Sequence, residues 1–254
     1  MPIHEFNPAP LTRQGDSFFI NRKKTFQGIP VPDELLKRSL RFAFDMTYGQ
    51  KGQHRPNRSG GDIQRDDWIL FANTFQGKLA EFCLQSQLAG AGADIPEPDT
   101  ETWALGQWDR YDLISDGKKI NVKSAAYFSN LLLLEKHDWN DKAEYLPNME
   151  DDPMFYDYFA LVRIKPDIKT LFRKQRPKAG QIVTEKFIWP IVKNEIWQYD
   201  IPGQLPREAV AHCIQNQKLP KNALLNGRIR MDASNYYIQA GDFRNIHEII
   251  GQKH

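Results

Sequence analysis

The dipeptide Asp116-Gly117 separates two short runs of residues that favour β-structure, and it constrains the local fold strongly. An Asp-Gly pair readily adopts the positive backbone φ angles that a tight type I′ turn requires. The sequence therefore predicts a β-hairpin, with a first strand around residues 108–115 and a second strand over residues 119–124.

Helical patterns precede this hairpin. Residues 32–48 begin with Pro32 and Asp33 and carry apolar residues on one broad face, which predicts a helix. Residues 66–92 predict a longer helix with an aspartate N-cap, glycines at its end and a possible kink near Gly77. A further strand is expected over residues 155–166.

The remaining segments give weaker signals. Residues 1–31 are expected to form a surface arm, and the polar residues 135–153 a loop. Residues 181–192 and 195–202 predict at least one more strand, and residues 226–242 form the clearest β segment of the tail. We expect an α/β fold in which helices flank a central mixed β-sheet. It would comprise an N-terminal arm, helix and basic loop (1–65), a core (66–165) and a basic C-terminal extension packed on that core (166–254).

Composition excludes several classes of protein. The chain of 254 residues is 41% hydrophobic and 26% charged, as in ordinary globular proteins. Its longest aliphatic run, residues 131–134, is far short of the ~20 residues of a membrane-spanning helix, and no secretory signal is visible. With only two cysteines and no zinc-type histidine spacing, we expect a protein of the reducing cytoplasm with no membrane partner.

Charge is unevenly distributed along the chain. Net charge is +2, yet residues 1–65 carry +5, residues 93–157 carry −9 and residues 158–230 carry +9. Two basic segments that bracket an acidic one suggest a polyanion-binding cleft with carboxylates at its floor. The alternative is that these runs are solvated faces.

The hairpin places three polar residues together. Asp112 lies in the first expected strand, and Asn121 and Lys123 share one face of the second strand because side chains alternate along a strand. Phosphodiester hydrolysis uses a divalent cation on oxygen ligands and a cation that positions water. The spacing also suits a plain cross-strand Asp–Lys pair, an alternative that remains open.

This arrangement resembles the PD-(D/E)XK nuclease superfamily, which includes many type II restriction endonucleases. The resemblance covers residues 66–165, with Asp112 as its aspartate, residues 121–123 as its (D/E)XK element and Glu81 as the helix-borne glutamate. It implies that Asp112, Glu81 and Asn121 ligate Mg²⁺, for which Mn²⁺ can substitute. It also implies that Lys123 orients the attacking water and that the protein cuts double-stranded DNA.

The sequence departs from the family pattern in two places. Tyr111 stands where a proline is usual, and Asn121 replaces an acidic residue. An amide oxygen can bind Mg²⁺ but brings no charge, so either Glu81 compensates or the site is weakened. Asp109 and Asp116 are nearby substitutes for Asp112, although Asp116 suits a turn position better. A catalytically silent DNA-binding relative and a structure-specific junction or repair nuclease stay open as alternatives.

Basic residues outside the hairpin are candidates for DNA contacts, because Lys and Arg neutralise phosphates and Arg, Asn and Gln read base edges. They fall into a glycine-rich loop, a segment that follows the core, and the tail: Lys51, Gln53, His54, Arg55, Asn57, Arg58, Arg65, Arg173, Lys174, Arg176, Lys178, Arg228 and Arg230. A palindromic cut would require two copies of the chain, so we expect a homodimer.

Overall fold

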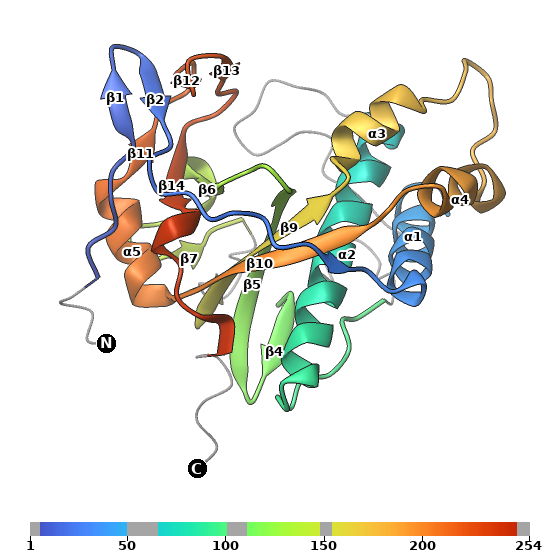
Figure 1. Cartoon of the computed structure of the whole chain (residues 1–254), viewed down its shortest axis with the longest axis horizontal. Coiled ribbons are helices and arrows are strands. Elements are labelled where there is room, and N and C mark those ends of the chain that lie inside the picture. The colour runs from blue at the N-terminus through green and yellow to red at the C-terminus, as the bar shows by residue number, and fades with distance from the viewer. Residues whose placement is uncertain (1–5, 50–65, 101–110, 148–153, 248–254) are drawn as a thin grey trace.

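A mixed five-stranded β-sheet forms the centre of the molecule (Figure 1). The computed structural model describes residues 6–49, 66–100, 111–147 and 154–247. Strands β5 and β9 run parallel, and the other neighbours are antiparallel. In sheet order the strands are β3 (Ile29–Pro30), β10 (Gln198–Pro206), β9 (Tyr158–Lys165), β5 (Lys118–Ala126) and β4 (Leu113–Ser115).

Helix α2 (Asp67–Gly90) covers one face of this sheet. It begins at Asp66, whose Oδ1 accepts a hydrogen bond from the Ile69 N–H at 2.9 Å. Outside α2, on the right of Figure 1, lie α1 (Asp33–Thr47), α3 (Ile168–Lys174) and α4 (Glu185–Lys193). Alternate residues of β5 and β9 pack into this layer, among them Ile120 and Val162.

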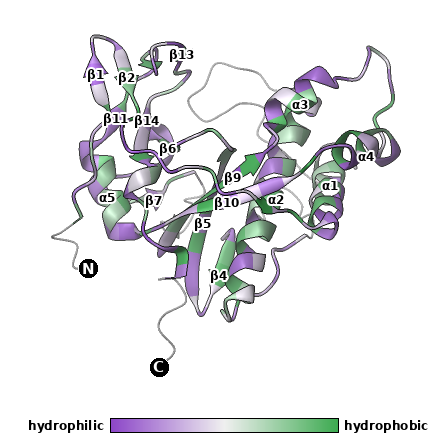
Figure 2. Cartoon of the chain, viewed as in Figure 1, coloured by the Kyte–Doolittle hydropathy of each residue, from purple (hydrophilic) through white to green (hydrophobic). Residues whose placement is uncertain are grey.

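The opposite face of the sheet packs on α5 (Arg207–Asn216) and on a smaller antiparallel sheet. That sheet has the order β11 (Lys218–Leu219), β14 (Asn235–Gln239) and β6 (Leu131–Glu135). The short helices η2 (Lys136–Asp138) and η3 (Ala240–Asp242) follow β6 and β14, and β7 (Glu144–Tyr145) pairs with β8 (Met154–Phe155). Figure 2 shows hydrophobic residues concentrated on β4 and β9, between the two layers.

A third sheet joins the two ends of the chain. Strands β1 (Thr12–Gln14) and β2 (Ser17–Phe19) form a hairpin, and β2 pairs in parallel with β12 (Leu224–Leu225). Strand β12 pairs in turn with β13 (Ile229–Arg230), which runs antiparallel to it. The segment before Pro32 therefore lies at the surface, as expected, but contributes strands to two sheets.

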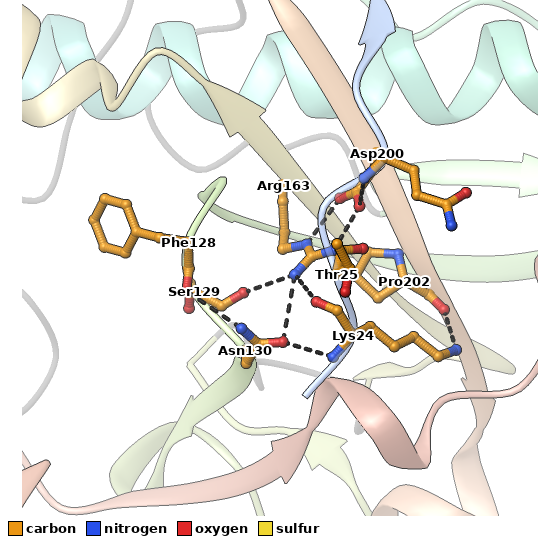
Figure 3. Close-up of polar contacts among 9 residues, drawn as sticks. Lys24, Thr25, Phe128, Ser129, Asn130, Arg163, Asp200 and Pro202 are labelled. Atoms are coloured by element: carbon orange, nitrogen blue, oxygen red, sulfur yellow. Dashed lines mark hydrogen bonds and ion pairs between the residues drawn. The ribbon is translucent and has the colours of Figure 1, made fainter. Parts of the chain in front are cut away.

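A buried arginine fastens this N-terminal segment to the core (Figure 3). Arg163 of β9 is 1% exposed and forms an ion pair with Asp200 of β10. Its guanidinium also donates to the carbonyl oxygens of Lys24 and Thr25, at 2.9 and 3.2 Å. The Gln27 N–H donates to the Asp200 carboxylate at 3.0 Å. The backbone groups of the N-terminal segment and the buried charges of the ion pair therefore act as hydrogen-bond partners for each other.

The structure confirms the expected α/β class with a mixed sheet, the helices near 32–48 and 66–92, and the hairpin turn. Asp116 and Gly117 have φ angles of 47° and 73°. Helix α2 continues through Gly77 without interruption. Residues 185–193 form helix α4 rather than a strand, whereas β10 occupies 198–206.

Candidate functional site

The hairpin of β4 and β5 brings Asp112 and Asn121 together. Leu113 pairs with Ile120, and Asp112 precedes β4 by one residue, in a bend, rather than lying within the first strand as expected. The Asn121 Nδ2 donates to Asp112 Oδ2 at 3.1 Å, and the Val122 N–H donates to the same oxygen at 2.7 Å. The carboxylate is consequently held in one orientation against the second strand.

Lys123 lies on the same face of β5, two residues beyond Asn121. Its Nζ is 5.5 Å from the centroid of the Trp139 ring, on the segment that follows η2. Burial lowers the pKa of Lys123, while the charges of Asp112, Asp138 and Glu135 act in the opposite direction. Lys123 thus lies in the field of three carboxylates.

Two of those carboxylates were not among the residues predicted from the sequence. Glu135 ends β6 and Asp138 ends η2, and both were assigned to a polar loop. They follow β5 closely in the chain, but no pattern in the sequence shows that the chain turns back after β5 so that their charges act on Lys123. The signal available beforehand was the excess of acidic residues in the segment 93–157.

The protonation of Asp112 is set by competing effects. Burial raises the pKa of Asp112, whereas Lys123, the Val122 N–H and Lys78 favour its ionised form. The two buried groups each favour the charged state of the other. The hairpin therefore holds an acid and an amine whose proton affinities have moved towards each other, as is common at catalytic sites.

Asn121 leaves one polar atom without a partner. Its side chain is 3% exposed, and within the described part of the chain its Oδ1 atom has no hydrogen bond of normal geometry, although the Tyr156 phenol lies within hydrogen-bonding reach of the amide. A buried amide oxygen without a donor is costly, and such atoms often mark a site for an ion or a ligand. This oxygen and the Asp112 carboxylate are the hard ligand type that Mg²⁺ prefers.

Glu81 is engaged by a lysine of its own helix. It is on α2 and forms an ion pair with Lys78 at 2.5 Å, and Lys78 also donates to the Asp99 carbonyl oxygen at 2.9 Å. Helix α2 packs on the face that carries Ile120 and Val122, so Asn121 and Lys123 face away from the α2 layer. Lys78 interacts with both carboxylates: it forms the ion pair with Glu81, and its charge favours the ionised form of Asp112.

Aromatic side chains surround the candidate site. Tyr156 lies 5.7 Å from Tyr111 and 6.1 Å from Trp139, measured between ring centroids. Burial, followed by the charge of Asp112, raises the pKa of Tyr156, so the phenol remains protonated at neutral pH. Tyr111 occupies the position where the resemblance expects proline, and its ring belongs to this cluster.

Of the two alternative acidic residues, the structure describes Asp116. Asp116 is exposed and occupies the hairpin turn with a positive φ, so it is a turn residue. Asp109 lies outside the described residues. Among residues that the structure describes, no group of three or more His, Cys, Asp or Glu side chains is arranged to hold a metal ion.

The predicted DNA-contacting residues are spread over the molecule. Arg173 and Lys174 form the last turn of α3, and Arg176 pairs with Asp66 at the start of α2. Arg228 and Arg230 are exposed at the β12–β13 hairpin, which lies left of centre in Figure 1, whereas α3 lies right of centre. Lys178 is exposed after α3. The loop residues lie outside the described ranges: Lys51, Gln53, His54, Arg55, Asn57, Arg58 and Arg65.

Comparisons of this chain with protein-family models, with curated proteins and with solved structures returned no match. No helix within the described ranges is both long enough and apolar enough to cross a membrane. A functional interpretation therefore depends on the chemistry of the residues themselves.

Proposed function

We propose that this protein is a Mg²⁺-dependent DNA endonuclease with a restriction-endonuclease-like core, acting on double-stranded DNA. The observation that carries the proposal is the meeting of Asp112, Asn121 and Lys123 at the β4–β5 hairpin. The helix–hairpin–strand order of α2, β4, β5 and β9 also agrees with the resemblance.

The side chains have distinct roles in this proposal. Asp112 and the Asn121 Oδ1 atom would hold the divalent ion, with Mn²⁺ as a substitute and Glu81 as a more distant acidic contributor. The ion would stabilise the charge that develops on the phosphoryl oxygens. Lys123 would orient the attacking water, and its lowered pKa allows it to exchange a proton near neutral pH more readily than an exposed lysine.

Basic residues on separate parts of the surface would hold the DNA. Arg173, Lys174, Arg176 and Lys178 near α3 and Arg228 and Arg230 at the β12–β13 hairpin would neutralise phosphates. Binding of a palindromic site would require a homodimer, since each copy supplies one hairpin and therefore one cut.

A second candidate function is DNA binding without cleavage. It is favoured by the hydrogen bonds that already engage Asp112 Oδ2 and by the Lys78 ion pair of Glu81. With a neutral Asn121, the site would then hold too little negative charge for a divalent ion. Duplex binding would persist and would weaken steeply with salt.

Cleavage of plasmid DNA in Mg²⁺ or Mn²⁺ tests the first candidate. We expect Asp112→Asn and Lys123→Met to lower the cleavage rate at least about 100-fold, because each removes a group that acts on the reacting phosphate. Asp116→Asn and Lys118→Met serve as matched controls in the same hairpin and should cut like the wild type. Undiminished cleavage by both site variants would exclude these residues from the reaction.

Asn121→Asp distinguishes the two candidates. If the wild-type protein binds duplex DNA without cutting and Asn121→Asp gains cleavage, the chain is a silent relative that lacks one ligand charge. If the wild-type protein cuts and Asn121→Asp cuts with less metal, the amide is a working ligand of the endonuclease.

A further inference from the structure

A hollow with a volume of about 510 Å³ lies apart from the β4–β5 hairpin, beside the N-terminal strands. Its walls come from the β1–β2 hairpin and from the turn that follows β11. Ligand pockets of globular proteins fall in the range of about 300–1,000 Å³, so a sugar-phosphate unit fits within this hollow. Figure 2 shows hydrophilic residues along β1.

The lining of this pocket is predominantly cationic. Arg13, Lys218 and Lys221 contribute three positive charges, and Asp16 contributes one negative charge. All four residues are exposed. Within the described ranges neither Arg13 nor Lys218 has an ion pair. A concave site with net positive charge concentrates anions.

Arg13 is held in place before any ligand arrives. Its Nε donates to the Gly15 carbonyl oxygen at 2.9 Å, and its guanidinium carbon lies 5.6 Å from the centroid of the Phe18 ring. A planar guanidinium that is already oriented loses less side-chain entropy when it binds a phosphate.

Backbone hydrogen bonds fix the opposite wall to the hairpin. The Asn222 N–H donates to the Met231 carbonyl oxygen at 2.8 Å, and the Leu224 N–H donates to the Asp16 carbonyl oxygen at 3.0 Å. The Lys221 N–H donates to Ser234 Oγ at 3.0 Å. The cations therefore stand on two walls whose separation is set by the fold.

This pocket is distinct from the basic residues predicted in the tail. Strand register places Arg13 in one row with Phe18 and Leu225, whereas Arg230 belongs to the neighbouring row with Leu224 and Ser17. Successive rows of a sheet face opposite sides. Arg13 and Arg230 therefore leave the sheet on opposite faces.

We propose that the pocket of Arg13, Lys218 and Lys221 is a phosphate-binding site that engages the backbone of the DNA substrate. In naming DNA this proposal rests on the proposed function, but phosphate recognition itself does not. A free nucleotide or inorganic phosphate presents the same phosphate group as the DNA backbone. The experiment therefore compares binding of DNA with binding of these small ligands.

The test uses the full chain with Arg13, Lys218 and Lys221 all replaced by Gln. The matched control replaces three other exposed lysines, Lys142, Lys186 and Lys193, by Gln. One arm measures the affinity for a fluorescent 30-base-pair duplex in Ca²⁺ between 50 and 200 mM salt. The other arm titrates AMP and inorganic phosphate without DNA and follows chemical-shift changes.

We expect the pocket variant to bind the duplex at least about 10-fold more weakly and to lose about 2–3 units of the salt slope, since each phosphate contact contributes about 0.9. The control should match the wild type. Wild-type affinity and slope in the pocket variant would overturn the DNA assignment. If AMP and phosphate shifts also persist in that variant, the pocket is no phosphate site.

Cleavage separates this proposal from the proposed function. If the wild-type protein cuts no DNA but the pocket variant alone loses duplex binding, the endonuclease proposal fails and the phosphate site stands. If AMP binding is lost in the variant while duplex binding is unchanged, the site takes free nucleotide and the DNA assignment is overturned.

Discussion

Arg163 and Asp200 face each other across the β9–β10 pair and form a two-pronged ion pair in the interior, with Nε–Oδ1 and Nη2–Oδ2 distances of 2.8 and 2.5 Å. The guanidinium also binds backbone carbonyl oxygens of the N-terminal segment (Figure 3). The guanidinium also donates to the Ser129 carbonyl oxygen and to Asn130 Oδ1, so the pair joins four parts of the chain.

Removal of one partner of this pair should be strongly destabilising. We expect Arg163→Met to lower the free energy of unfolding by about 3–5 kcal/mol, because Asp200 is left buried without its counter-ion. Urea denaturation measures the change. The double variant Arg163→Met/Asp200→Leu should lose less than the single variant, and a loss below about 1 kcal/mol in the single variant would contradict this role.

Two glycines should respond to alanine in opposite directions. Gly203 has a φ of 148°, and a Cβ there would overlap the Arg244 carbonyl oxygen, so Gly203→Ala should cost at least about 2 kcal/mol. Gly77 lies within α2 with open space around its Cα, so Gly77→Ala should stabilise by about 0.5–1 kcal/mol. Thermal unfolding measures the Tm of both variants, and Tm shifts of the same sign and size would contradict this prediction.

The two cysteines should be unreactive in the folded protein. Burial raises the pKa of Cys213 to about 12 and also raises the pKa of Cys83. At pH 8 about one Cys213 thiol in 10⁴ would be ionised, and both side chains are buried. Ellman's reagent should therefore react with two thiols only after denaturation in urea, and rapid reaction without urea would contradict the burial.

The raised pKa of Asp112 predicts a pH dependence of stability. The folded protein binds the Asp112 proton more tightly than the unfolded chain, whose value is near 3.8. Between that value and the raised pKa, stability from this group falls as pH increases, by at most about 1.4 kcal/mol per pH unit. Urea denaturation between pH 4 and 7 gives the free energy of unfolding as a function of pH. Its slope should differ between wild type and Asp112→Asn, and identical slopes would argue against a raised pKa of Asp112.

Local patterns predicted the elements that depend on neighbouring residues. The Asp116-Gly117 turn, the Asp66 cap and the periodicity of α1 and α2 are all set within a few positions of the chain, so the helices and the hairpin were predictable. The same local geometry predicted that Asp112 and Asn121 would meet.

Features that depend on distant pairing were not predictable in this way. Residues 185–193 carry a β-like apolar run, yet Ile188 and Val192 lie on one buried side of a helix that begins at Thr184, whose side chain accepts the Phe187 N–H. The charges of Glu135 and Asp138 act on Lys123 because the chain turns back after β5, and β6 pairs there with β14, about 100 residues further along the chain. No local pattern contains that information.

The parallel pairing of β2 with β12 joins Phe18 to Leu225. Strand β2 is synthesised long before this partner, because about 200 further residues must be added before β12 is complete. At about 5–20 residues per second, that delay lasts about 10–40 s. The β1–β2 hairpin therefore waits for the strand that completes its sheet.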